Sequence, residues 1–257
     1  MASNSINSNY GAQVALHNLN ATNRQLETTQ NRLNTGFKVA TAKDNGAVFA
    51  VATNMRAEAA SLDAVTNSIN RGQSMVDVAL AAGETITEAY QELKALSVAI
   101  KGAESGSSSL AAYQADFDAI VEEIEAALEA ANFDEKNLFS DTVTVMTGLE
   151  EDAELEIGSN FSLSVTNSSE PDDVQEELEE FTAALAELGT QSKSLQRQGV
   201  FISKLQGAME TGVDNLVAAD LAKESSKLVA LQTKQQLGAQ ALSIANSSSN
   251  ILLSLFR

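Results

Sequence analysis

Apolar residues recur at helical spacing from the first residues of the chain onward. One column, with a leucine every seven positions, predicts a helix over residues 5–35: Leu19, Leu26 and Leu33. Asn34-Thr35-Gly36 is a helix stop signal. Residues 36–46 then predict a connector, in which Asp44 is a candidate N-cap for the helix that follows.

A much longer heptad pattern predicts a coiled-coil-like helix from Ala47 to about Lys101. One column is Val48, Met55, Leu62, Ile69, Val76, Gly83, Tyr90 and Ser97, and its partner column is Val51, Glu58, Val65, Gly72, Ala79, Ile86, Leu93 and Ile100. Twelve of these 16 positions are apolar. Such a helix is roughly 80 Å long at 1.5 Å per residue, which predicts an elongated rod.

In the middle of the chain, the spacing of the apolar residues changes twice. Residues 110–131 predict a helix with an acidic outer face. Residues 142–165 alternate apolar and polar side chains, which predicts a small β-hairpin or three short strands. Residues 172–215 return to helix, with an apolar column at Val174, Phe181, Leu188, Leu195, Ile202, Met209 and Leu216.

The last segment, residues 216–257, predicts a helix that is apolar on more than one side. One seam is Leu221, Leu228, Leu231, Leu242, Ala245, Leu252 and Phe256, and a second is Leu237, Ala241, Ile244, Ile251 and Leu255. An antiparallel return of the chain brings the first and last helices together. We expect other copies of the chain to cover what remains exposed, so the candidate self-assembly core is Ile6, Leu19, Leu26, Leu33, Leu221, Leu228, Leu231, Leu237, Leu242, Ile244, Ile251, Leu252, Leu255 and Phe256.

Charge is concentrated in the middle of a chain whose formal net charge is −19. Residues 104–190 carry 23 acidic side chains and one basic side chain, whereas the two ends are nearly neutral. We therefore expect the middle to face water and the ends to pack against like copies without strong repulsion. Clustered cations are lacking, so nucleic acid is not an expected partner. The longest apolar runs fall short of a membrane span, and the start lacks the pattern of a secretory signal.

Catalytic and metal-binding patterns are also missing from the sequence. There are no cysteines. The single histidine, His17, has no residue in the sequence that can be paired with it as a second metal ligand or as a member of a catalytic triad. The acidic stretch at residues 150–154 lacks the spacing and glycine of a calcium loop. We predict no enzyme activity, no catalytic residues, no metal site and no cofactor.

Residues 32–47 read RLNTGFKVATAKDNGA, with Gly36, Lys43, Asp44 and Asn45 as a connector motif. This block resembles one found in bacterial flagellins. The start and the ending, ILLSLFR at residues 251–257, are similar as well. Residues 132–139 are similar to a family turn, with Asp134-Glu135 in the place of Asn-Gly. The resemblance covers residues 1–139 and 172–257, so the central insert is short.

The resemblance implies a mainly α fold: an elongated coiled-coil-like rod of paired terminal helices and a three-helix bundle, with a small β-hairpin. The terminal helices, 1–43 and 216–257, form a filament-core domain, and 44–215 form a rod domain with the hairpin at about 142–165 and an acidic outer surface. It further implies a secreted, extracellular subunit of the flagellar filament for swimming motility, exported unfolded by the flagellar type III apparatus. A hook-filament junction protein is the alternative, and a generic coiled coil leaves the terminal blocks unexplained.

The resemblance also implies partners: a homopolymer or copolymer with other flagellins, hook-filament junction and cap proteins, and an export chaperone. No membrane is among them. Many flagellins contact an innate immune receptor through a charged stretch, which is degenerate here at Gln91, Glu92, Lys94 and Ala95, so we expect weak or no recognition. Hydroxyls on expected surface loops are candidate O-glycan positions: Ser107, Ser108, Thr142 and Thr144.

Overall fold

The computed structural model describes residues 9–150 and 152–255, with side chains described as far as Ser247. Its elements follow in the order α1 (Tyr10–Thr35), α2 (Gly46–Gly102), α3 (Ser108–Ala130), β1 (Val143–Met146), β2 (Glu154–Ile157), α4 (Pro171–Val217) and α5 (Leu221–Leu255). The mainly α fold with a small hairpin is confirmed. The chain forms two compact units, one built from the segments up to Arg56 and from Met209 onward and the other from Ala57–Ala208.

The second unit is built on α2 and α4, which run antiparallel. Asp63 bonds to Gln206 at 2.9 Å, Gln73 to Ser192 at 2.6 Å, and Tyr90 to Glu177 at 3.1 Å. From Leu62 to Ser97, every member of the first predicted column is buried, as are the α4 positions from Val174 to Ile202. The heptad prediction is therefore confirmed here. Val51 and Glu58 of the partner column are exposed instead.

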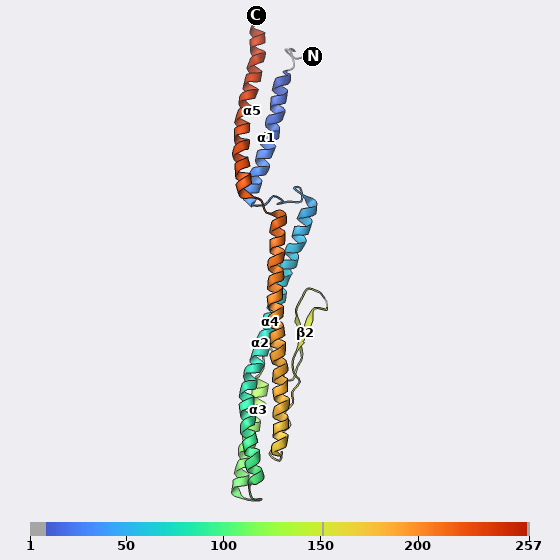
Figure 1. Ribbon diagram of the computed structural model, residues 1–257, viewed down its shortest axis with the longest axis vertical. Coiled ribbons are helices and arrows are strands. Elements are labelled where there is room, and N and C mark those ends of the chain that lie inside the picture. Colours follow the sequence, from blue (N-terminus) through green and yellow to red (C-terminus); the bar gives the residue numbers. More distant parts are fainter. Residues whose placement is uncertain (1–8, 151, 256–257) are drawn as a thin grey trace. The chain divides into compact units, whose positions relative to one another are not determined.

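Aromatic side chains fill the centre of this unit. The ring of Phe181 lies 5.7 Å from Tyr90, 5.6 Å from Phe139 and 4.9 Å from Phe161 between centroids. All four side chains are buried. α3 contributes the buried Phe117 and Ile124, and α2 and α4 run alongside each other in Figure 1.

The hairpin is shorter than the alternating segment at residues 142–165. β1 and β2 pair antiparallel, with Val143 opposite Ile157 and Met146 opposite Glu154. The third apolar-polar stretch, residues 161–165, is extended without forming a strand. The N–H of its first residue, Phe161, donates to Phe139 C=O at 2.7 Å. The stretch is therefore held by the loop that precedes the hairpin rather than by β2. Of the two sequence alternatives, the hairpin is correct and the three strands are wrong.

The first unit holds the terminal helices, α1 and α5, together with the start of α2 and the end of α4. The break between α4 and α5 falls at residues 218–220, not at 215/216 as the sequence suggested. Asp220 explains the position, because its Oδ1 accepts from Lys223 N–H at 3.0 Å and caps α5. The division into a filament-core domain and a rod domain at residues 43/44 and 215/216 stays a prediction.

Candidate functional site

α1 and α5 form an antiparallel pair, side by side in Figure 1. Three contacts set the register along it. Asn9 Nδ2 donates to Ala245 C=O at 2.7 Å, Gln235 Nε2 donates to Asn23 Oδ1 at 2.8 Å, and Arg32 pairs with Glu224 at 3.3 Å. The predicted pairing of the first and last helices is thus present in the structure.

One seam of each helix faces the other. Leu231 is buried to 4 % exposure, and five further leucines of the two helices are half-buried: Leu19, Leu26, Leu33, Leu228 and Leu242. The helices approach closely at Gly238, where a Cβ atom would lie 3.2 Å from Leu19 Cδ1. Two helices alone therefore leave most of their leucines partly in contact with solvent.

The described part of the second seam of α5, Leu237, Ala241 and Ile244, is exposed rather than covered by α1. Leu237 is 58 % exposed and Ile244 is 71 % exposed. Leu221, assigned from sequence to the α1-facing seam, is also exposed because it is the first residue of α5. An apolar surface of this kind on a helix pair is typical of an interaction site.

The prediction from heptad columns missed other exposed apolar residues of the pair. They are Tyr10, Val14, Leu16 and Val229. Those on α1 lie outside the column of Leu19, Leu26 and Leu33, from which alone the helix was predicted. Counting the apolar residues outside that column would have identified them. Of the predicted assembly residues, Ile6 and Phe256 lie outside the described residues, as do the side chains of Ile251, Leu252 and Leu255.

The connector after α1 starts at Gly36, whose positive φ of 75° is the left-handed conformation that ends many helices. Its neighbours pair with the α4–α5 linker. Lys38 N–H donates to Val217 C=O at 2.7 Å, and Ala219 N–H donates to Gly36 C=O at 2.8 Å. Beneath this pairing, Ala52, Val213 and Val217 form a small buried cluster.

The N-cap prediction at this connector was wrong by one residue. Asn45 caps α2, because its Oδ1 accepts from Val48 N–H at 3.2 Å. Asp44 instead closes the preceding turn, accepting from the N–H groups of Ala40 and Thr41 at 3.1 and 2.9 Å. The bonds from Thr41 hold the pKa of the Asp44 carboxyl below its usual value. Lys43 is exposed.

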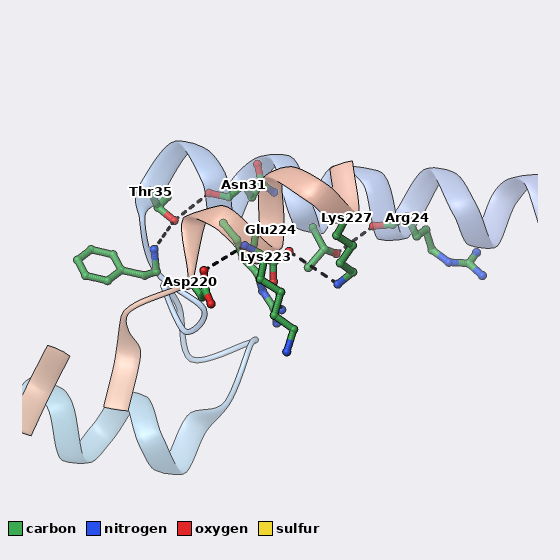
Figure 2. Close-up of polar contacts among 10 residues, drawn as sticks. Arg24, Asn31, Thr35, Asp220, Lys223, Glu224 and Lys227 are labelled. Carbon is green, nitrogen blue, oxygen red and sulfur yellow. Dashed lines mark hydrogen bonds and ion pairs between the residues drawn. The ribbon is translucent and has the colours of Figure 1, made fainter. Parts of the chain in front are cut away.

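Polar side chains cluster where α1 and α5 meet the connector (Figure 2). Glu224 is buried and lies 3.3 Å from Arg32 and 3.8 Å from Lys227. Arg24 belongs to the same surface, and its guanidinium carries no drawn contact in Figure 2.

The remaining candidates lie on the second unit. Gln91, Glu92 and Ala95 are exposed on α2, whereas Lys94 is half-buried and bonds to Gln175 of α4. The four candidate O-glycan positions are not all in loops. Ser107 caps α3 by accepting from Leu110 N–H at 3.1 Å, Ser108 begins that helix and Thr144 lies in β1, while Thr142 is an exposed loop residue.

Known proteins are similar in sequence to both ends of the chain. Residues 6–144 match the family profile described as the bacterial flagellin N-terminal helical region, and residues 172–256 match the C-terminal helical region. The chain belongs to the bacterial flagellin family. It is similar to flagellin FljK of Caulobacter vibrioides, with 45 % identity over 100 % of both chains. It is also similar to a flagellin of Brucella melitensis, with 34 % identity over 98 % of this chain and 99 % of that one.

Membership of this family decides between the classes that the sequence left open. Flagellins are structural proteins, so this flagellin is a structural subunit of the filament and not an enzyme. The full-length similarity does not favour the junction-protein alternative. The family forms the bacterial flagellar filament, which is extracellular. None of the described helices combines the length and hydropathy needed to span a membrane.

Proposed function

We propose that this flagellin polymerises through the exposed apolar surface of α1 and α5, with residues 1–43 and 216–257 forming the core of the filament. The observation that supports this most directly is the exposure of Leu237 and Ile244 on a face that α1 does not cover. The residues identified from sequence as the self-assembly core supply the contacts. Residues 44–215 form the outer rod domain, whose acidic side chains stay in water.

Burial of this surface drives assembly. A leucine or isoleucine side chain contributes about 1.5–3 kcal/mol when it is fully removed from water. The free α1–α5 pair buries few side chains, which barely offsets the entropy of ordering two long helices at about 1–2 kcal/mol per residue. The terminal helices therefore become ordered as copies join. A head-to-tail contact that does not close on itself extends into a helical tube.

The partners follow from the same surface and from the family. Caulobacter vibrioides has several similar flagellins, among them FljK, FljM and FljN. Copolymerisation with sister flagellins is therefore part of the proposal, with hook-filament junction proteins, cap proteins and an export chaperone as further partners. Export proceeds unfolded through the flagellar type III apparatus. Nucleic acid and membranes are not partners, and the stretch at residues 91–95 gives weak or no recognition by an innate immune receptor.

Polymerisation of purified variants tests the proposal. We expect Leu237→Gln and Ile244→Gln each to raise the critical concentration for filament formation about tenfold, the equivalent of 1.4 kcal/mol. Val98→Gln is the matched control, because Val98 is exposed to a similar extent on α2, outside the terminal helices. Sedimentation and electron microscopy measure the outcome.

Deletion of residues 216–257 is the stronger version of the test. The truncated chain should stay in solution without forming filaments at any concentration. Filaments from the truncated chain, or wild-type assembly by both glutamine variants, would show that another surface drives polymerisation.

A further inference from the structure

The charged residues of the α1–α5 pair are confined to one part of it. α1 and α5 carry five cations, Arg24, Arg32, Lys223, Lys227 and Lys234, and two carboxylates, Glu27 and Glu224. All of them lie within residues 24–32 and 223–234, while the rest of both helices has His17 as its sole titratable side chain besides Tyr10. The exposed Leu237 and Ile244 thus lie on a different segment of α5 from its charged residues.

Three of the five cations line a shallow pocket of about 320 Å³: Arg24, Arg32 and Lys227. Ala21, Gln25 and Thr28 complete its lining. Glu224 compensates part of this charge through its ion pairs with Arg32 and Lys227. Arg24 has no ion pair among the described residues, and the buried Arg32 Nε has no hydrogen-bond partner there. The pocket therefore keeps a surplus of positive charge and an unused donor.

The pair has a single exposed carboxylate, that of Glu27, since Glu224 is buried. Glu27 forms no ion pair with any described residue, including Arg24 three positions earlier on α1. The pocket residues of α1, from Ala21 to Arg32, follow one helical stripe. With 3.6 residues per turn, Glu27 lies roughly 120° around α1 from the centre of that stripe. In this structure the Glu27 carboxylate therefore stays unpaired and outside the lining of its own chain's pocket.

We infer that the pocket formed by Arg24, Arg32 and Lys227 receives the Glu27 carboxylate of a second copy of this chain. The inference rests on the proposed function, in which terminal helices of neighbouring copies pack together. Donor and acceptor lie on different faces, so the contact is head-to-tail and can repeat from copy to copy. It would set the register and orientation of the copies, while the apolar surface supplies the affinity.

Charge exchange between copies tests this contact. Arg24→Glu leaves an acidic side chain in the pocket, and Glu27→Arg removes the carboxylate that should enter it. We expect each variant alone to raise the critical concentration for polymerisation about tenfold. An equimolar mixture of the two should assemble near the wild-type concentration, because each copy then meets a complementary neighbour. The double variant R24E/E27R should also assemble.

Lys234→Glu is the matched control, because it makes the same charge change on α5 outside the pocket. It should polymerise like the wild type. Failure of the wild type and of K234E to form filaments would count against the proposed function itself. Normal assembly of both R24E and E27R, or a mixture as inactive as its separate components, would overturn the Glu27 contact alone.

Neutral variants keep the test decisive if charge reversal disturbs folding. In a double-mutant cycle, R24Q, E27Q and the double variant should show the same loss of assembly, because one contact is lost in all three. Additive losses would mean that the two side chains act independently and would overturn the inference. Circular dichroism of each variant checks that helix content is unchanged.

Discussion

The Tyr90 hydroxyl of α2 donates a hydrogen bond of 3.1 Å to Glu177 Oε1 of α4 in the centre of the second unit. Glu177 is a buried carboxylate without a cation in the ion pairs of the described residues. Ser164 supplies its remaining donors, through its N–H at 2.7 Å and its hydroxyl at 2.6 Å. Three neutral donors thus hold a buried charge, and the same carboxylate fixes residues 161–165 to the bundle.

Tyr90→Phe should destabilise the protein by about 1–2 kcal/mol, because one donor to a charged acceptor is lost while the ring still packs on Phe181. Urea unfolding, followed by circular dichroism, measures the difference. Tyr113→Phe is the control, since Tyr113 is exposed on α3. Equal stability of Y90F and the wild type would mean that the hydrogen bond contributes nothing net.

The same residue predicts a loss of stability at alkaline pH. Burial, followed by the nearby Glu177 charge, raises the pKa of Tyr90 above its ordinary value of 10.0. The unfolded chain then releases the proton at a lower pH than the folded protein. The stability that Tyr90 contributes is therefore complete below about pH 10 and declines as the pH rises above it. Unfolding measured from pH 8 to 11 should show a steeper decline for the wild type than for Y90F.

The turn between α3 and the hairpin contains two strained residues. Asp134 and Glu135 have φ values of 55° and 63°, in the left-handed region where glycine and asparagine are favoured. Phe133 and Lys136 pair across this turn. Glu135→Gly should therefore stabilise the protein by up to about 1 kcal/mol, less the entropy that glycine adds to the unfolded chain. If E135G unfolded at a lower urea concentration than the wild type, the backbone conformation of Glu135 would not be strained.

That turn shows how sequence and structure agree at some positions and not at others. The position of the turn could be predicted from the sequence, because residues 132–139 are similar to a turn of the family in which Asn-Gly stands in the place of Asp134-Glu135. The long helices were equally predictable, because buried columns such as Val174 to Ile202 repeat a single spacing over many turns. A spacing of apolar residues that repeats over many turns predicts a helix even where single positions depart from it.

Local capping and long-range contacts were less predictable. Asp44 and Asn45 are both good N-cap residues, and only the course of the backbone decides which one caps α2. The exposure of Leu221 depends on where α5 begins, which the sequence placed a few residues too early. The pocket of Arg24, Arg32 and Lys227 joins residues about 200 positions apart, so no local pattern could reveal it.

Gly72 of α2 lies against the hairpin. A Cβ atom at this position would lie 2.6 Å from Val145 Cγ2 and 3.2 Å from Val145 Cγ1. Valine is stiff about χ1 and cannot easily move both methyl groups away. Gly72→Ala should therefore destabilise the protein by about 1–3 kcal/mol despite the better helix propensity of alanine.

Gly189 provides the matched control for this substitution. It lies in the interior of α4, and a Cβ atom there would have no neighbour within 4 Å. Gly189→Ala should stabilise the protein by up to about 1 kcal/mol through helix propensity alone. Urea midpoints that move in the same direction for G72A and G189A would show that Val145 does not restrict the site.

Gln191 of α4 holds the end of the hairpin through both backbone groups of Gly158. Its Oε1 accepts from Gly158 N–H at 3.0 Å, and its Nε2 donates to Gly158 C=O at 3.0 Å. Gln191→Glu keeps the acceptor and replaces the donor with a carboxylate oxygen that faces the carbonyl. The variant also places a second acid one turn from Glu187. We expect Q191E to lose about 1–3 kcal/mol at pH 7.

The loss in Q191E should shrink as the pH falls toward about 4.3, the ordinary pKa of a glutamic acid, because a carboxylate that the fold disfavours takes up its proton at a higher pH in the folded protein than in the unfolded chain. A protonated carboxyl has one O–H donor and can again bond to Gly158 C=O. Gln191→Leu separates this effect from general acid sensitivity, because it lacks both polar groups at every pH. The stability difference between Q191E and the wild type should narrow from pH 7 to pH 4, while that of Q191L should not. Parallel pH profiles for the two variants would rule out a role for the side-chain donor.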